Sequence, residues 1–230
     1  MKTLTDNGKK TIRAAFNVLT AVCTATGLLR FILMSNIAVT FAYFTIQSNF
    51  LCLIMSVITL VRVIRNSNPK EGKYIFFKGL TLVSILLTFA VYNFVLKPAI
   101  NMAETLESAL LHIAVPLMML ADFIFFEDKE CFKKWHPFGW ALFPVFYVAY
   151  TAVYKALGGT YGYFENTVRN FPYFFLDYET YGLPLVGLWV LLITIGFIGF
   201  SYLLLGFCSI FNKIKLNKSK DKQPASPQSQ

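Results

Sequence analysis

Long apolar segments alternate with short polar connections along most of this chain. A helix of about 20 apolar residues crosses the hydrocarbon core of a bilayer. The runs are continuous, whereas a strand of a membrane barrel would alternate polar and apolar residues over about ten positions. We therefore predict six transmembrane helices, over residues 12–34, 38–62, 75–96, 106–126, 138–157 and 183–211.

The composition agrees with a membrane protein built only of helices. The chain is 56% hydrophobic and only 14% charged, whereas an average soluble domain is about 25% charged. Six helices occupy nearly all of residues 1–211, so we predict one all-α polytopic membrane domain and no separate soluble domain. The polar tail, residues 212–230, contains Pro and Ser but no aromatic residue after Phe211, and we predict that it is disordered.

The cations gather in four places: before the first predicted helix, between the second and third, between the fourth and fifth, and after the sixth. Lys and Arg in short loops are retained on the cytoplasmic side. Both termini are therefore predicted to be cytoplasmic, in a multi-pass protein of the cell membrane. The net charge of +9 is explained by the retention of Lys and Arg on the cytoplasmic side, where anionic lipid headgroups attract them. Membrane lipid is therefore the expected partner, and nucleic acid is not.

The cysteines and the standard catalytic motifs give no sign of a metal or cofactor. Cys23, Cys52, Cys131 and Cys208 are scattered without a CxxC pair, which does not fit a disulfide framework or a zinc site. The HExxH, GxSxG, GxGxxG and P-loop patterns are all absent from the sequence. We expect no metal and no cofactor.

A polar stripe lies on the second predicted helix. Thr45, Ser48, Asn49 and Cys52 occupy positions i, i+3, i+4 and i+7, so they share one helix face. One explanation is structural, because hydroxyl and amide side chains join neighbouring membrane helices at about 0.6–2 kcal/mol each.

His112 lies inside the fourth predicted helix, four residues before Pro116. Ionisable side chains within a span are costly and usually face the bundle interior or a wet cavity. Proline has no N–H, so the His112 carbonyl loses its usual helical partner and we expect the helix to bend there. The alternatives are a functional pocket and a histidine that only bonds to a neighbouring helix.

Thr45 and His112 are predicted to lie at the same depth. Each is six or seven residues from the outer end of its helix, or about 10 Å at 1.5 Å per residue. A threonine hydroxyl becomes a nucleophile when an adjacent base accepts its proton, and a neutral imidazole is suited to this. The pair can therefore be interpreted as nucleophile and base.

The segments FAYFTIQSNFLCLI and LLHIAVPLMML resemble the androgen-induced, ADTRP-like family of multipass membrane proteins, and FPYFFLDYETYG is similar to an aromatic loop in its bacterial six-helix relatives. The resemblance covers about residues 10–210. It implies an intramembrane threonine hydrolase that acts on fatty acid esters of hydroxy fatty acids. In that case Thr45 would be the nucleophile, His112 the base, and a lipid ester the substrate.

Further roles follow for residues near this pair. Ser48 and Asn49 are the nearest candidates on the same helix face to stabilise an oxyanion. Tyr173 and Asp177 belong to a long aromatic loop, which is either an interfacial aromatic belt or a lid over the outer mouth of the pocket.

Two other polar residues are predicted to have structural roles. Asp122 is predicted to lie near the cytoplasmic interface, paired with a Lys or Arg, and His136 to be an interface residue.

The competing function is a non-enzymatic carrier or binding protein for lipid or a small solute. The absence of an internal repeat and of acidic residues at midplane weighs against a carrier.

Overall fold

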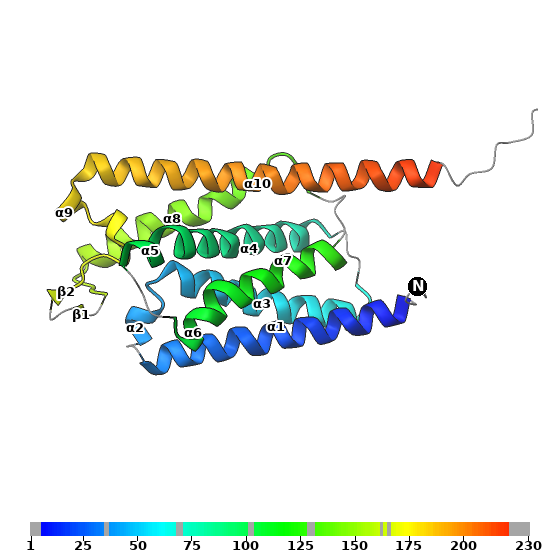
Figure 1. The fold of residues 1–230 in the computed structure, drawn as a ribbon, viewed down its shortest axis with the longest axis horizontal. Helices are drawn as coiled ribbons and strands as arrows, with labels where there is room; N and C mark the ends of the chain where they lie inside the picture. The colour runs from blue at the N-terminus through cyan, green and yellow to red at the C-terminus, as the bar shows by residue number, and fades with distance from the viewer. Residues whose placement is uncertain are drawn as a thin grey trace, which may run out of the picture.

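The structure is a computed structural model, and it describes residues 6–34, 37–67, 71–100, 104–127, 132–161, 163–164 and 167–220. It is all-α except for one antiparallel hairpin, in which Tyr163 pairs with Val168 and Phe164 with Thr167. The long helices form one elongated bundle (Figure 1). They are α1 (Asp6–Met34), α3 (Phe44–Ile64), α4 (Gly72–Val91), α7 (Val115–Phe126), α8 (His136–Ala156) and α10 (Leu183–Lys220).

Short elements extend or connect the long helices. Two π-helical turns, Tyr92–Leu96 and Leu110–Ala114, continue α4 into α5 and join α6 to α7. The others are α2 (Ile37–Thr40), α5 (Lys97–Ile100), α6 (Leu106–Ala109), β1 (Tyr163–Phe164), β2 (Thr167–Val168), a 3-10 turn at Phe174–Leu176, and α9 (Tyr178–Tyr181).

Five helical segments among the described residues are long and apolar enough to cross a membrane, which indicates an integral multi-pass membrane protein. These segments are Asp6–Met34, Phe44–Ile64, Gly72–Ala99, Leu106–Phe126 and Leu183–Lys213. The fifth predicted helix corresponds to α8, which is 21 residues long. It contains Pro144 in its interior and is rich in tyrosine, so it is less apolar than the others.

The helix boundaries differ from the predicted ones at two places. The predicted helix 38–62 is interrupted at residues 41–43, so that Thr45 lies in the first turn of α3 and not seven residues within a continuous helix. The last predicted helix continues to Lys220, so residues 212–220 are helical and not a disordered tail. Residues 221–230 lie outside the described part of the chain.

The two ends of the bundle differ in character. The start of α1, the ends of α3 and α7, the start of α4 and the end of α10 lie together at what we call the basic end (Figure 1). The hairpin, α2, α5, α6 and α9 lie at the opposite end, which we call the hairpin end (Figure 1). The predicted cation-rich connections thus meet at one end.

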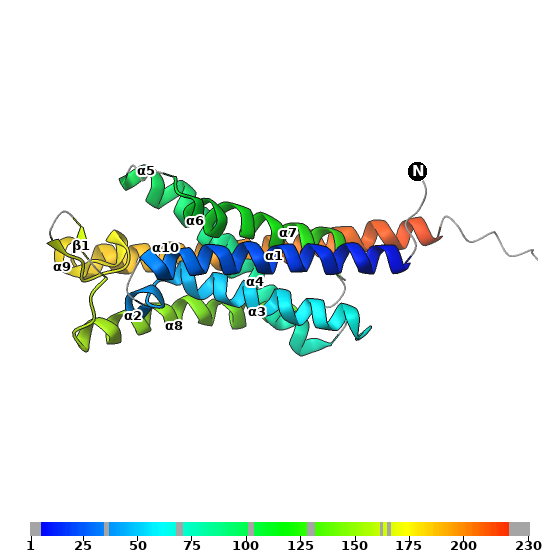
Figure 2. The same cartoon turned by 90° about the horizontal axis from the view of Figure 1, so that it is seen from below.

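Helix α4 lies at the centre of the packing and α10 at its edge. Of the most apolar window of each helix, 56% is buried in α4 but only 11% in α10. Figures 1 and 2 show α10 running along one side of the bundle, and its main partners among the long helices are α8 and α4. The core around α4 is formed by residues such as Cys52, Leu82, Val115, Met119 and Trp140.

Candidate functional site

Thr45 lies where the chain enters α3 after the break at residues 41–43. Tyr43 is extended, and its carbonyl accepts from the N–H groups of Ile46 and Gln47. The first N–H groups of a helix have no carbonyl one turn earlier. Tyr173 lies here, with its hydroxyl close to the side chain and backbone of Thr45 and its ring in contact with Tyr43.

A small apolar cavity adjoins Thr45. Its free space is about 60 Å³. Thr45, Tyr92, Tyr147 and Tyr173 belong to its lining, and apolar side chains of α4, α8 and α10 complete it, among them Leu87, Val91, Val148, Val190 and Ile193. The predicted nucleophile therefore borders a mostly apolar space.

His112 lies in the π-helical turn between α6 and α7, and its orientation is fixed on two sides. Its Nδ1 is 3.1 Å from the Ser108 carbonyl oxygen, and its ring stacks on Tyr92 at 3.7 Å between centroids. A carbonyl oxygen can only accept, so Nδ1 carries the proton and Nε2 presents a lone pair. This is the tautomer that a base requires.

Both π-helical turns end two residues before a proline, Pro98 or Pro116. Proline removes an N–H from the helical ladder and crowds the carbonyl four residues earlier, and a wider turn relieves the clash. Asn93 Nδ2 donates to the His112 carbonyl at 3.3 Å. A side chain of the neighbouring helix thus supplies the donor that Pro116 lacks.

The structure places Thr45 and His112 on neighbouring helices at the hairpin end. Asn49 Nδ2 donates both to the Thr45 carbonyl at 2.8 Å and to the Leu111 carbonyl at 3.1 Å, and it thereby joins the turns that hold the two residues. No hydrogen bond among the described residues connects the Thr45 hydroxyl to the His112 ring. The cavity reaches Tyr92, which stacks on His112, but not His112 itself.

Ser48 and Asn49 join helices in the way that the structural explanation of the polar stripe requires. Ser48 Oγ is 2.8 Å from Thr88 Oγ1 and 3.0 Å from the Thr45 carbonyl. The Asn49 amide is bound to two carbonyls. The donors of both side chains are engaged, so their contacts support bridging between helices more than binding of an oxyanion.

Tyr173 and Asp177, the two candidate lid residues, have different surroundings. Tyr173 lines the cavity, and burial raises the pKa of its hydroxyl. Asp177 instead caps α9, because its carboxylate accepts from the N–H groups of Glu179 and Thr180 at 3.1 and 3.0 Å. Only Tyr173 touches the candidate site.

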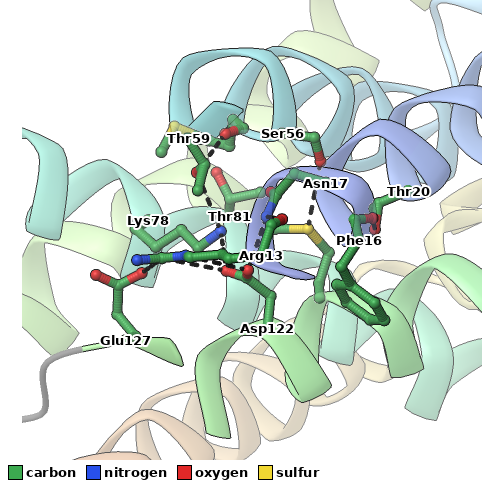
Figure 3. A network of polar contacts seen from close by, with 12 residues as sticks. Arg13, Phe16, Asn17, Thr20, Ser56, Thr59, Lys78, Thr81, Asp122 and Glu127 are labelled. Atoms are coloured by element: carbon green, nitrogen blue, oxygen red, sulfur yellow. Dashed lines mark hydrogen bonds and ion pairs between the residues drawn. The ribbon is translucent and has the colours of Figure 1, made fainter. Parts of the chain in front are cut away.

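A second polar site is a buried ionic cluster (Figure 3). It lies toward the basic end, near the starts of α1 and α4 and the end of α7. Lys78 and Asp122 are 0% and 1% exposed, and Lys78 Nζ lies 2.8 Å from Asp122 Oδ2. Asn17 Nδ2 donates to the same carboxylate at 2.8 Å, and Arg13 Nε lies 3.4 Å from it. The predicted pairing of Asp122 with a Lys or Arg is confirmed.

The cluster continues toward the surface through Glu127. Arg13 Nη2 is 2.5 Å from Glu127 Oε2, and the Tyr74 hydroxyl donates to the same oxygen at 3.1 Å. Apart from the pairing of Asp122, this cluster was not predicted from the sequence. The sequence feature that could have revealed it is Lys78, a charged residue inside a predicted span. Such residues usually pair with a side chain of another helix.

His136, predicted as an interface residue, is buried among aromatic side chains. It begins α8 and is 3% exposed. Four aromatic rings surround it, those of Phe76, Phe132, Trp135 and Trp140. Its Nδ1 accepts from the Lys133 N–H at 3.3 Å. These contacts give it a packing role between α4 and α8.

The described residues contain no group of three or more His, Cys, Asp or Glu side chains that could hold a metal ion. Within the same part of the chain Cys23, Cys52 and Cys208 are free thiols, and Cys131 lies outside it. Searches against protein-family models, curated proteins and solved structures find no match to this chain. The geometry of the two sites is therefore the basis for assigning a function.

Proposed function

We propose that the protein is an integral membrane hydrolase of lipid esters, with Thr45 as nucleophile and His112 as base. The observation that carries the proposal is the placement of Thr45, which lies at a helix start, lines an apolar cavity and is close to the Tyr173 hydroxyl. The proposal includes α8 as a sixth transmembrane helix, a cytoplasmic basic end with both termini, and a location in the cell membrane. It agrees with the family resemblance of the sequence.

The reaction would proceed through a threonine ester. Thr45 Oγ1 attacks the ester carbonyl carbon while Nε2 of His112 accepts the hydroxyl proton. The bond from that carbon to the alcohol oxygen then breaks, and the alcohol leaves with the proton from His112. Water, deprotonated by the same imidazole, attacks the acyl-Thr45 ester and releases the fatty acid with the threonine hydroxyl restored.

A candidate hydrogen-bond donor to the oxyanion, Tyr173, lies at the start of α3. The Tyr173 hydroxyl is close to the Thr45 and Phe44 backbone, and a phenol is protonated and able to donate near neutral pH. Removing one donor from an oxyanion hole lowers the rate by about 100- to 1,000-fold in other enzymes. Tyr173 fits this role better than Ser48 or Asn49, whose donors are already bound.

Binding of substrate requires a movement. The cavity of about 60 Å³ is far smaller than the roughly 300–1,000 Å³ of ordinary ligand pockets. Its outer wall includes Val190 and Ile193 of α10, the least buried of the apolar helices. In the proposed mechanism α10 shifts to admit an acyl chain from the bilayer, and the Tyr92 ring moves so that His112 reaches Thr45.

The test is covalent labelling of the purified protein with a fluorophosphonate probe. Wild type is compared with Thr45→Ala, His112→Ala and the control Thr24→Ala, a buried threonine of α1 whose hydroxyl bonds only within its own helix, to Thr20. Labelling should disappear in the first two variants and persist in the control. Absence of labelling in folded wild type, or its survival in Thr45→Ala, would refute the proposal.

A lipid or small-solute carrier is the second candidate. The observation in its favour is the Lys78–Asp122 pair, because ionisable residues inside membrane helices often mark a path for ions or substrates. A carrier would keep its binding or transport when Thr45 is replaced by Ala, and would lose it when Asp122 is replaced by Asn. The hydrolase proposal expects the opposite for Thr45.

A further inference from the structure

A larger cavity opens at the basic end, far from Thr45. Its volume is about 530 Å³, and α1, α3, α4, α7 and α10 all contribute to its lining. Arg13 and Tyr74, which belong to the buried ionic cluster, line it together with Lys9, Lys10 and Arg62. The volume falls within the range of ordinary ligand sites.

The charges inside the cavity do not balance. In the buried cluster, the cations Arg13 and Lys78 are matched by the carboxylates Asp122 and Glu127. These four buried charges cancel one another. Neither carboxylate of the cluster is left to neutralise further cations nearer the opening.

The excess positive charge comes from lysines nearer the opening. Arg62 is matched by Glu71, with Nη1 and Oε2 2.5 Å apart. Lys9 and Lys10 have no carboxylate partner among the described residues, and Lys10 Nζ donates instead to the neutral Asn66 Oδ1 at 2.5 Å. Two unmatched ammonium groups over one cavity favour an anion with one or two negative charges.

The rest of the lining is apolar. Phe125, Phe126 and Phe211 line the same cavity as the lysines. A phosphate group would accept hydrogen bonds from the lysines, and the beginning of an acyl chain would pack against the phenylalanines. We infer that this cavity binds the phosphate group of an anionic phospholipid through Lys9 and Lys10.

The cations at this end also have a simpler explanation, since lysines on the cytoplasmic side orient membrane proteins without binding anything specific. Two other lysines allow the explanations to be separated. Lys73 and Lys134 are both exposed. Lys73 lies in the first turn of α4 and Lys134 just before α8, and neither belongs to the cavity lining. Replacing them changes the net charge by the same amount.

The experiment measures thermal unfolding of the full-length protein in uncharged detergent while one probe is titrated. The probes are short-chain phosphatidic acid, short-chain phosphatidylcholine, and glycerol 3-phosphate as a soluble phosphate monoester. The proteins are wild type, Lys9→Gln/Lys10→Gln, and the control Lys73→Gln/Lys134→Gln. Both pairs change exposed residues, and each variant is used only if it elutes as wild type does in size exclusion.

We expect phosphatidic acid to raise the unfolding temperature of wild type with a saturable dependence. The apparent affinity should fall by about tenfold or more in Lys9→Gln/Lys10→Gln and stay within about twofold in the control. A matching response to glycerol 3-phosphate, lost in the same variant, supports the phosphate site but assigns it to soluble phosphate. No stabilisation by either phosphate probe, an equal loss in both variants, or an equal effect of phosphatidylcholine would overturn the inference.

Discussion

Replacing Asp122 with Asn should destabilise the protein more than replacing Lys78 with Met, although both changes break the same 2.8 Å ion pair. Without Lys78, the carboxylate keeps Asn17 at 2.8 Å and Arg13 at 3.4 Å. In Asp122→Asn, the ammonium keeps only neutral partners among the described residues, the new amide oxygen and the Thr59 hydroxyl at 3.4 Å. A buried charge with only neutral partners is costlier than one with a cation and an amide.

The magnitudes follow from these partners. Removing one member of a buried pair costs about 3–5 kcal/mol, so we expect about 4–5 kcal/mol for Asp122→Asn. We expect about 1–3 kcal/mol for Lys78→Met, because two donors remain on the carboxylate. At about 2–4 °C per kcal/mol for a chain of this size, the unfolding temperature falls by about 8–20 °C and about 2–12 °C, respectively. The double variant leaves neither charge of the pair, so its loss should be smaller than the sum.

The assay is thermal unfolding in detergent of wild type, both single variants and the double variant, which together form a double-mutant cycle. Glu71→Gln is the control, because it breaks the more exposed pair with Arg62 and should cost about 1 kcal/mol or less. Additive single effects, or a larger loss for Lys78→Met than for Asp122→Asn, would show that the pair is not isolated from water as the structure implies.

Three further predictions concern α4 and the hairpin end. Gly79→Ala places a methyl carbon 2.2 Å from the ring of buried Trp140 and should cost about 1–3 kcal/mol in thermal unfolding, whereas Gly196→Ala meets no atom within 4 Å and should be neutral or stabilising. Asn93→Leu removes the donor to the carbonyl before the proline and should cost about 0.6–1.7 kcal/mol in the same assay; an unchanged unfolding temperature would mean that another donor replaces it. Tyr173→Phe should slow fluorophosphonate labelling by at least tenfold. In wild type, the phenol donates a hydrogen bond only while it is protonated, and its pKa is raised in the folded state, so the labelling rate should fall for this reason only above pH 10. Equal labelling rates in wild type and Tyr173→Phe would remove Tyr173 from the site.

The apolar segments could be predicted because lipid leaves the backbone few choices. Each N–H and C=O within the hydrocarbon must be paired, so a long apolar run becomes a helix whatever its neighbours are. The segment 106–126 is helical throughout, as predicted, and only the π-helical turn that precedes Pro116 interrupts its regularity. Proline is visible in sequence, and so is the disturbance that it causes.

The break before Thr45 could not be predicted in this way. Residues 41–43 contain neither proline nor glycine. The turn is held by tertiary contacts, since the Tyr43 hydroxyl donates to the Tyr161 carbonyl at 3.1 Å and its ring contacts Tyr173. These partners are more than 100 residues away in the chain, so no local pattern identifies them. Contacts of this kind override local helix preference.

The ionic cluster was hidden for a different reason. Averaging over a window makes Lys78 look like a small interruption of an apolar run, although it is 0% exposed. Its meaning depends on Asp122 of α7 and Arg13 of α1, and the pairing of helices is not contained in hydropathy. A charge inside a span predicts that a partner exists, but only the arrangement of the helices shows which one.

The packing between the two cavities favours separate sites over a continuous path. On α3, Thr45 borders one cavity and Thr59 the other, about 21 Å apart along the helix at 1.5 Å per residue. The core side chains between these levels are almost completely buried, including Cys52 and Val115 at 0% and Met119 at 1%. A carrier that moves a solute along the bundle must open this core, which close packing makes costly. A hydrolase with a lipid site at its other end needs α10 and the Tyr92 ring to move but leaves this core closed, and α10 has the smallest buried share of the five apolar spans.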